Sequence, residues 1–487
     1  MEKMASSFIS SFNFSSYSKS VALFASLYSL YFLLISANVS GFESLLQLLP
    51  SSASLRTKSE SLFQVNDFGA AGDGITDDTR SFKDIWDMAC SSPSHAKIVI
   101  PAGYSFLVRH INFAGPCWSK VSIRIAGTIL APKDPEVWDG LNPQKWLYFF
   151  KVKHLTVEGG GIINGMGQEW WARSCKVNRT NVILFAIVYI VLYGSLSHNE
   201  FDVSFILLAL SSCSNGQFCL SLYALTFHKC NNLKVKNIKI FNSQQMHLAF
   251  TGCKHVTVSQ LVVKAPGDSP NTDAIHISSS TQVNVKDCTI GTGDDCISIV
   301  GNSSRIKVKN IVCGPGHGIS IGSLGKSNSF SQVYNVHVNG ASISNTENGV
   351  RIKTWQGGSG FVKKVSFENV WMENVSNPII IDQYYCDSTK PCSNKTSNIR
   401  IDSISFMGIK GTSATERAVT LACSDSCPCR QLYLEDIQLT SSSGVSATFF
   451  CWQAYGTTSG LNYPPPCFPC NDGTLQPKFL SNWSQSI

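Results

Sequence analysis

The chain has 487 residues, of which 15% are charged and 43% hydrophobic, and its formal net charge is +7. This length allows several ordinary domains or one long repetitive domain. The positive balance is modest and no run of Lys or Arg occurs, which makes nucleic acid a poor candidate partner. Gly is common, with 36 residues, and long amphipathic helical patterns are scarce, so we expect an all-β protein with many turns.

The N-terminal segment, residues 1–41, has the order of a secretory signal. Lys3 and Lys19 precede an apolar stretch over 21–35, and small residues follow it. We predict a signal peptide here, with an uncleaved anchor as the alternative, and export from the cytosol in either case. Residues 42–62 are predicted to be a linker, and we expect no stable membrane span in the mature chain.

Cysteine usage agrees with export. Eighteen cysteines in an exported chain favour disulfides over metal sites. Cys423, Cys427 and Cys429 lie close together, but no histidine is near them, so we expect a disulfide-tied C-terminal cap and not a zinc site. Glycosylation sequons fit a secreted surface and occur at Asn302, Asn374, Asn394 and Asn482.

A short amphipathic helix is predicted ahead of the main body of the chain. Phe82, Ile85, Trp86 and Met88 recur at helical spacing after a possible N-cap at Asp78 or Thr79. Such a helix would close the open N-terminal end of a solenoid. The Asp77–Asp78 pair is accordingly interpreted as structural.

The main body carries a repeated ten-residue pattern in which two alternating apolar positions, a polar pair and two more apolar positions follow one another. The polar pair often ends in Asn and is expected to turn a corner. Stacked coils would share one apolar core, so we predict a right-handed parallel β-helix over 63–470, with a β-sandwich as the alternative, followed by a tail at 471–487. The nine copies start at Leu155, Leu233, Val256, Val283, Ile306, Val336, Val365, Ile399 and Leu432.

Residues 182–223 do not carry the repeat and include two apolar runs that are too short to span a bilayer. Without this stretch, the first two copies would be spaced like the others. We interpret it as an insertion and hypothesise that it is translated non-coding sequence, such as a retained intron.

Three short strings downstream carry the chemistry. They are Asn271-Thr-Asp273, Gly293-Asp-Asp295 and Gly316-His-Gly318, and Asp273, Asp295 and His317 are each 22 residues apart. At one coil per step, these side chains would lie on adjacent rungs. Crowded carboxylates raise one another's pKa, so one can remain a proton donor while another activates water. This is the two-carboxylate chemistry of glycoside hydrolysis.

Cations follow on a later copy. Arg351 and Lys353 flank an inward-facing Ile352, so both are expected to face outward and to hold a substrate carboxylate. Taken singly, each string has a structural explanation: an Asx turn, a calcium loop or a turn histidine. Their order on successive coils favours one joint site.

These residues resemble the polygalacturonases of glycoside hydrolase family 28, especially the secreted plant members. The motifs Asn-Thr-Asp, Gly-Asp-Asp, Gly-His-Gly and Arg-Ile-Lys all occur here in the family's order. The resemblance covers about residues 63–470, apart from the insertion. It implies a β-helix that hydrolyses α-1,4 bonds between galacturonic acid units in pectin.

The resemblance also implies a role for each matching residue. Asp294 would be the general acid, with its proton tuned by His317, and Asp273 and Asp295 would activate the water. Asn271, Arg351, Lys353 and Tyr385 would bind substrate. A family disulfide matches Cys296 and Cys313, and two more disulfide candidates are Cys386 and Cys392.

Several expectations complete this interpretation. We expect a monomeric enzyme of the cell wall that needs neither cofactor nor metal.

The stereochemical course is a separate question. Carboxylates on neighbouring rungs would lie only ~5 Å apart, a separation associated with retention of configuration, whereas the family is held to invert. Two alternatives stay open: a calcium-dependent pectate lyase, and a wall-binding protein that the insertion has made inactive.

Overall fold

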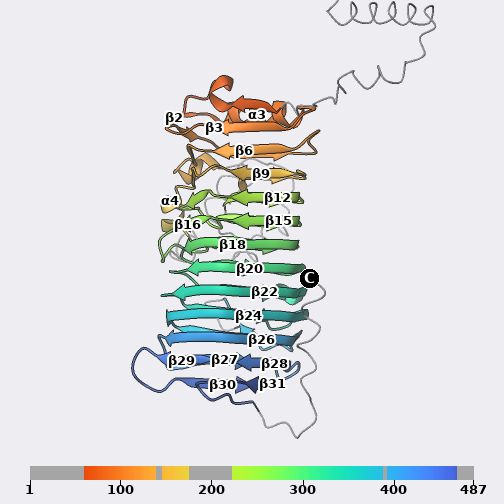
Figure 1. The fold of residues 1–487 in the computed structure, drawn as a ribbon, viewed down its shortest axis with the longest axis vertical. Helices are drawn as coiled ribbons and strands as arrows, with labels where there is room; N and C mark the ends of the chain where they lie inside the picture. The colour runs from red at the N-terminus through yellow and green to blue at the C-terminus, as the bar shows by residue number, and fades with distance from the viewer. Residues whose placement is uncertain (1–59, 139–144, 175–221, 388–391, 469–487) are drawn as a thin grey trace, which may run out of the picture. The chain divides into compact units, whose positions relative to one another are not determined.

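The structure, a computed structural model, describes residues 60–138, 145–174, 222–387 and 392–468. It is a right-handed parallel β-helix in which strands stack rung upon rung (Figure 1). The solenoid predicted from the repeat is therefore confirmed. The segment 1–41, the linker 42–62 up to residue 59, the insertion 182–223 up to residue 221, and the tail 471–487 lie outside the described residues.

The larger sheet, sheet A, has 20 strands and is the one labelled along the front of Figure 1. Its strands are β1 (Ser61–Gln64), β2 (Asp73–Asp77), β3 (Ala96–Ile100), β4 (Ser105–Leu107), β6 (Val121–Ile125), β7 (Thr128–Leu130), β9 (Leu155–Glu158), β10 (Ile162–Asn164), β12 (Asn231–Lys236), β13 (Lys239–Phe241), β15 (Lys254–Ser259), β16 (Val262–Lys264), β18 (Thr281–Gly291), β20 (Ser303–Cys313), β22 (Phe330–Ser344), β24 (Ser359–Val375), β26 (Asn398–Ser413), β28 (Cys429–Glu435), β29 (Gln438–Ser441) and β31 (Ala454–Ser459).

The smaller sheet, sheet B, has 11 strands and contributes one strand to each coil. Its strands are β5 (Ile111–Ala114), β8 (Lys145–Phe150), β11 (Tyr223–His228), β14 (Leu248–Thr251), β17 (Ile275–Ser278), β19 (Ile297–Ile299), β21 (Ile319–Leu324), β23 (Asn348–Trp355), β25 (Asn377–Tyr385), β27 (Arg417–Ala422) and β30 (Thr448–Trp452). The helical elements are α3 (Thr79–Cys90), α4 (Gln168–Ala172) and the 3-10 turns η1 (Val65–Phe68), η2 (Pro135–Trp138) and η3 (Lys326–Asn328).

One apolar core runs through all coils, because equivalent residues of successive copies are paired in register. Val283 of β18 pairs with Ile306 of β20, which pairs with Val336 of β22 and then with Val365 of β24. All four side chains are buried. A single coil could not bury this face alone, so each coil depends on its neighbours for stability.

The predicted register is wrong in one copy. Val365 pairs with Ile404, whereas Ile399, the predicted start of that copy, pairs with Gly360. Ile399 and Ile401 are fully buried and alternate with polar residues in the same way as Ile404 and Phe406. The same pattern, two apolar residues one position apart followed by a two-residue corner, occurs at Ile399 and again at Ile404, so the pattern alone cannot locate the start of the coil.

The corners after the first apolar pair use left-handed backbone, as the recurrent Asn suggested. Asn237, Asn310 and Asn369 have φ of 48°, 54° and 54°. Asn tolerates this region better than most residues with a Cβ. The amide of Asn310 also donates to the carboxylate of Asp287 on the preceding rung, at 3.0 Å, so the corner side chains link neighbouring coils.

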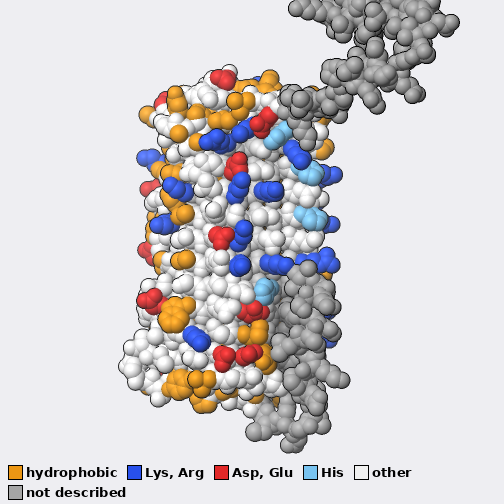
Figure 2. Space-filling view, in the orientation of Figure 1, with side chains coloured by type: hydrophobic (Ala, Val, Ile, Leu, Met, Phe, Trp, Pro, Cys, Tyr) orange, Lys and Arg blue, Asp and Glu red, His pale blue; other side chains and the backbone are white. Residues whose placement is uncertain are grey.

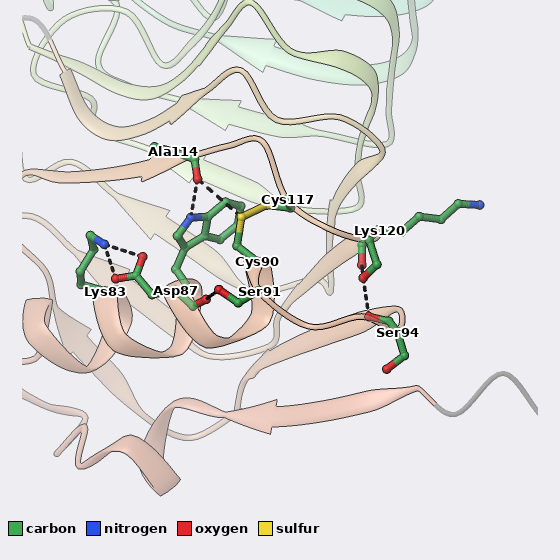
Figure 3. The surroundings of a disulfide bond; sticks show 10 residues. Lys83, Asp87, Cys90, Ser91, Ser94, Ala114, Cys117 and Lys120 are labelled. Atoms are coloured by element: carbon green, nitrogen blue, oxygen red, sulfur yellow. Dashed lines mark hydrogen bonds and ion pairs between the residues drawn. A yellow bond between two sulfur atoms is a disulfide. The ribbon is translucent and has the colours of Figure 1, made fainter.

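Helix α3 packs on the first coils, where the N-terminal cap was predicted. Its buried face is Phe82, Ile85, Trp86 and Ala89, while Met88 is 53% exposed and does not belong to it. Figure 3 shows Cys90, at the end of α3, joined to Cys117 in the segment between β5 and β6. The Asp78 carboxylate makes no helix-capping bond and instead accepts from the backbone of Ala71 and Gly72, which supports its structural interpretation.

The coil that contains the insertion skips no rung. Val157 of β9 pairs directly with Val235 of β12, and β10 pairs directly with β13. The last sheet strand before the insertion, β10, ends at Asn164, and the next one, β11, begins at Tyr223 on the following rung. In the described ranges, none of the helices combines the length and the apolar content needed to cross a bilayer.

Five disulfides lie within the described ranges, and four cysteines there are free. The bridges are Cys90–Cys117, Cys296–Cys313, Cys386–Cys392, Cys423–Cys429 and Cys451–Cys467, and the free thiols are those of Cys230, Cys253, Cys288 and Cys427. The last two bridges tie the C-terminal coils together. On the outer face of sheet A, basic side chains stand between mostly uncharged ones (Figure 2).

Substitution of a corner Asn tests the role of the left-handed backbone. Asn310→Val places a β-branched residue at positive φ and removes the bond to Asp287, so we expect the free energy of unfolding to fall by about 1–3 kcal/mol. Urea unfolding followed by circular dichroism measures this. Asn310→Gly, which keeps the backbone conformation accessible, should cost much less; equal losses in the two variants would contradict the explanation.

Candidate active site

The residues singled out from the sequence lie along the outer face of sheet B, at the beginnings of adjacent strands. Ile275, Ile297 and Ile319 pair with one another in β17, β19 and β21. Asp273, Asp295 and His317 each lie two residues before one of these isoleucines. The structure thus brings the three side chains onto successive rungs, as the spacing of 22 residues predicted.

The middle residues of the motifs hold these turns together. Thr272 is fully buried, and its hydroxyl accepts from the backbone N–H of Gly293, at 3.0 Å, and donates to the carbonyl of Ser269. A Cβ on Gly293 would lie 2.0 Å from the carbonyl oxygen of Ser269, so no larger residue fits there. Thr and Gly therefore set the position of the acids that follow them.

A buried histidine, His247, anchors the turn of the first motif, Asn271-Thr-Asp273. The N–H of Ser243 donates to His247 Nε2, at 3.3 Å, so the proton lies on Nδ1, which donates to the Thr272 carbonyl at 3.1 Å. Complete burial lowers the pKa of His247 to about 4, which keeps the ring neutral. Its role is to anchor the turn that carries Asn271 and Asp273.

Asp295 lies at the centre of a buried ion cluster. Its Oδ1 accepts from Arg351, at 2.8 Å, and from the hydroxyl of Ser320, at 2.7 Å, while its Oδ2 accepts from Lys353 at 3.1 Å. Arg351 also donates through Nε to Ser320, at 3.0 Å. Only 2% of the Asp295 side chain and 9% of each cation is exposed, so their mutual contacts replace the hydration that each has lost.

Asp294 belongs to a second group of side chains, with Asn271, His317 and Glu347, that is more exposed to solvent than the ion cluster. Its Oδ1 lies 3.0 Å from His317 Nδ1, and its Oδ2 lies 3.5 Å from the amide of Asn271. The other ring nitrogen of His317 lies 3.2 Å from a carboxylate oxygen of Glu347, which is 56% exposed. His317 therefore bridges Asp294 to a second acid.

Burial and mutual repulsion set the charge states of this group. Burial raises the pKa of Asp273, and the charge of Asp294 raises it further. Burial would lower the pKa of His317, but its hydrogen bond to Asp294 and the charges of Asp294, Glu347 and Asp295 outweigh that effect and raise it. The site thus holds protons at a pH where isolated Asp and His would release them.

Tyr385 lies at the end of β25 beside the cations. Lys353 Nζ is 5.3 Å from the centre of its ring, and the ring of Trp355 meets it edge-on with centroids 5.3 Å apart. Burial and the nearby Asp387 raise the pKa of Tyr385, so its phenol stays neutral. The rings of Tyr385 and Trp355 therefore pack together beside Lys353.

The glycines that flank His317 lie where neighbouring rungs approach one another closely. A Cβ on Gly318 would lie 2.1 Å from the carbonyl of Asn348, and one on Gly316 would lie 2.7 Å from the carbonyl of Asp294. These glycines allow neighbouring rungs of the protein to approach one another.

Three side chains of the site were missed from the sequence. Ser320 pairs with Arg351 across the sheet and is outward-facing between two buried isoleucines, so the alternation around it could have placed it here. Glu347 precedes β23 on the rung after His317. His276 lies on the outward face of β17, with Nδ1 3.9 Å from the Asp273 carboxylate and 2.8 Å from the Ser298 hydroxyl.

One group of side chains in the described ranges could bring three metal ligands together. One ligand atom each of Asp294, Asp295 and His317 lies within 4.8 Å of the others. Both oxygens of Asp295 already accept from cations, and a divalent ion there would lie close to Arg351 and Lys353. The arrangement favours cation-held carboxylates over a metal site.

The disulfide candidates lie at the two ends of this region. Cys296, the residue after Asp295, pairs with Cys313 at the end of β20, and Cys386, the residue after Tyr385, pairs with Cys392. Each bridge begins next to a side chain of the site, so each restrains the position of that side chain.

Comparison with known proteins agrees with this geometry. The family model described as glycosyl hydrolases family 28 matches residues 90–203 and 210–458. The chain belongs to this family. A protein of Arabidopsis thaliana named as a probable polygalacturonase is 52% identical to this family 28 hydrolase over 446 residues, covering 91% of this chain and 93% of the relative. A polygalacturonase of Persea americana is 43% identical over 395 residues, covering 81% and 77%.

Solved structures show the same fold at lower identity. An endo-xylogalacturonan hydrolase from Aspergillus tubingensis superimposes on the family 28 hydrolase with a TM-score of 0.64 at 22% identity, covering 82% of this chain and 99% of the other. A polygalacturonase from Erwinia carotovora gives a TM-score of 0.59 at 20% identity, covering 80% and 94%. Both likenesses support the β-helix assignment.

A double-mutant cycle tests the ion cluster. Arg351→Met leaves Asp295 buried with one cation fewer, and we expect it to lower the free energy of unfolding by up to about 3 kcal/mol. Asp295→Asn should destabilise as well, because it strands Arg351 and Lys353. The double variant should lose less than the sum of the two, by about 1 kcal/mol or more in urea unfolding; simple additivity would contradict a direct interaction.

Proposed function

We propose that the protein hydrolyses α-1,4-galacturonosidic bonds of homogalacturonan, the galacturonic acid backbone of pectin. The observation that carries this proposal is the contact between the buried carboxylate of Asp295 and two cations, Arg351 and Lys353, next to a second acid, Asp294, that is hydrogen-bonded to His317. Carboxylates of this kind suit glycosidic cleavage, and the cations suit an acidic sugar. The polygalacturonases among the relatives support the same substrate.

Asp294 is proposed as the general acid that protonates the leaving oxygen. It shares a hydrogen bond with His317, and a proton in that bond can belong to either residue. The charges of Asp273 and Asp294 repel one another, as the raised pKa of Asp273 reflects, so the pair favours keeping one proton. His317 would return a proton to Asp294 after each turnover.

Asp273 and Asp295 are proposed to orient and deprotonate the attacking water. An ionised carboxylate offers about four acceptor sites, and three acceptor contacts of Asp295 are occupied by Arg351, Ser320 and Lys353. One site therefore remains for a water. The raised pKa of Asp273 makes its ionised form a stronger base than an ordinary Asp carboxylate.

Arg351 and Lys353 are proposed to bind the galacturonate carboxylate, with Asn271 and Tyr385 completing the subsite. Both cations already pair with Asp295, so the incoming carboxylate would share them. An Arg has five N–H donors and can serve two carboxylates at once. Tyr385 offers a flat apolar face next to Lys353 for the sugar ring.

Inversion of configuration is proposed as the stereochemical course. The short carboxylate separation would favour retention if the acids flanked a pocket, but these acids come from stacked rungs on one sheet. A carboxylate held by two cations is also a poor nucleophile.

We further propose secretion to the cell wall, on the basis of the predicted signal segment 1–41, and a monomeric state. Activity outside the cell fits the five disulfides, which persist in oxidising compartments. Calcium-dependent lyase chemistry would need a metal where Arg351 and Lys353 lie, so hydrolysis is the better supported reaction.

Asp294→Asn tests the proposed acid. The amide cannot donate a proton to the leaving oxygen, so we expect the release of reducing ends from polygalacturonate to fall by about 100-fold or more. Thermal unfolding should be nearly unchanged, because the amide can keep the contact with His317.

Asp87→Asn on α3, an exposed acid far along the chain from the site, is the matched control and should keep full activity. A chelator should have no effect, and NMR of the first product should show the inverted anomer. Activity retained in Asp294→Asn would disprove the acid assignment, whereas unsaturated products from the wild-type protein would identify a lyase.

The raised pKa of His317 generates a prediction for pH dependence. If the site must keep the proton of His317, kcat/KM declines as pH rises through that pKa. The charge of Glu347 helps to raise it, so Glu347→Gln should lower the pKa of His317 and move the alkaline limb of the pH profile to lower pH. Glu373→Gln, which changes an exposed acid of β24, should leave the profile unchanged; an unshifted limb in Glu347→Gln would count against a protonated His317.

A further inference from the structure

We infer that Phe450, Trp452 and Arg417 form a distal binding site for a further sugar unit of the acidic polysaccharide, several rungs from the ion cluster. This inference rests on the proposed function for the identity of the ligand. The site combines exposed aromatic rings with a guanidinium, and all three residues belong to the outer face of sheet B or its margin. Neither the sequence motifs nor the comparisons point to these residues.

The register of sheet B places the aromatic rings in line with the cations of the active site. Strands β23, β25, β27 and β30 are successive neighbours, and the paired residues follow two columns. The columns are Arg351–Ile380–Thr420–Phe450 and Lys353–Asp382–Ala422–Trp452. Three rungs at about 4.8 Å separate the ends of each column, which gives a distance of about 14 Å, the length of a few sugar units.

Both rings are exposed although their strand belongs to the core sheet. Phe450 is 37% exposed and Trp452 is 49% exposed, whereas the intervening Cys451 points inward and forms a disulfide. Large aromatic side chains that stay exposed side by side on one strand are candidates for contact with a ligand. An extended polysaccharide that starts at Arg351 and Lys353 and follows the columns would meet these rings.

Hydrogen bonds fix the orientation of the Trp452 ring, which together with the Phe450 ring forms the aromatic platform of the proposed site. Trp452 Nε1 donates to one oxygen of Asp425, at 2.9 Å, and the hydroxyl of Tyr384 donates to the other, also at 2.9 Å. A ring fixed in this way loses little conformational entropy when a sugar stacks on it. The charge of Asp425 disfavours a carboxylate directly above it, so the acidic group of the sugar is expected on the other side, towards Arg417.

Arg417 supplies the matching charge. Its guanidinium carbon lies 5.0 Å from the centre of the Phe450 ring, and no ion pair to Arg417 is found within the described ranges. A pyranose ring presents C–H groups that pack on an aromatic face, and its carboxylate can accept from a guanidinium beside that face. The set therefore fits a galacturonate unit better than a neutral sugar.

The test compares ligands of two lengths, measured as Kd by calorimetry in an Asp294→Asn background that prevents turnover. Trp452→Ala should raise the Kd of heptagalacturonate by up to about tenfold, as expected for loss of one aromatic contact. The Kd of trigalacturonate, which is too short to reach the platform from the ion cluster, should stay the same. Arg417→Met should weaken heptagalacturonate but not its methyl ester.

Trp371→Ala is the matched control, because Trp371 is 55% exposed on β24 of sheet A, away from the two columns. Trp452→Phe keeps a stacking face and should retain most of the affinity, which separates loss of the ring from loss of the fold. An unchanged heptamer Kd in Trp452→Ala, or an equal effect on the trimer, overturns the inference.

Failure of the proposed function gives a different result. In that case the wild-type protein would release no reducing ends, while the effect of Trp452→Ala on binding of the heptamer could still be measured. If the wild type hydrolyses polygalacturonate but the Trp452→Ala variant binds the heptamer normally, the proposed function stands and the distal site is rejected.

Discussion

Backbone hydrogen bonds between parallel strands fix each rung of this solenoid to the next, and that register decides where every outward side chain lies. A chemical group placed once per coil becomes part of a column, with its neighbours one strand spacing above and below. Asp273, Asp295 and His317 form such a column at the beginnings of β17, β19 and β21. No loop has to fold back to assemble the site, because the pairing of buried isoleucines does so.

Stacking also creates the electrostatic problem that the site has to solve. Three carboxylates on adjacent rungs repel one another, and burial adds a desolvation cost for each. The chain offsets this cost in two ways: Arg351 and Lys353 neutralise Asp295, and His317 shares a proton with Asp294. The acids consequently differ in their surroundings although they come from adjacent positions of one turn, since Asp295 faces fixed cations and Asp294 faces an imidazole.

Much of the fold followed from local pattern, and so did the gathering of the motif residues. Alternating apolar residues define an inward face, and Asn at the corner marks a left-handed turn, so both can be read without long-range information. The slip from Ile404 to Ile399 occurred because two adjacent apolar pairs, each followed by a two-residue corner, both match the repeat, and only strand pairing shows which one begins the coil. Alternation places Ser320 on the outer face, but the importance of Ser320 and of Glu347 depends on which side chains the neighbouring rungs present, and that requires the strand pairing.

The direct pairing of β9 with β12 has a consequence for how this architecture changes over time. Because consecutive rungs meet regardless of how much chain runs between them, the length of an excursion leaves the downstream register untouched. Two messages that differ only within residues 175–221 would therefore encode the same strand pairing between β9 and β12. Selection can then act on the length of that segment separately from the order of the later coils.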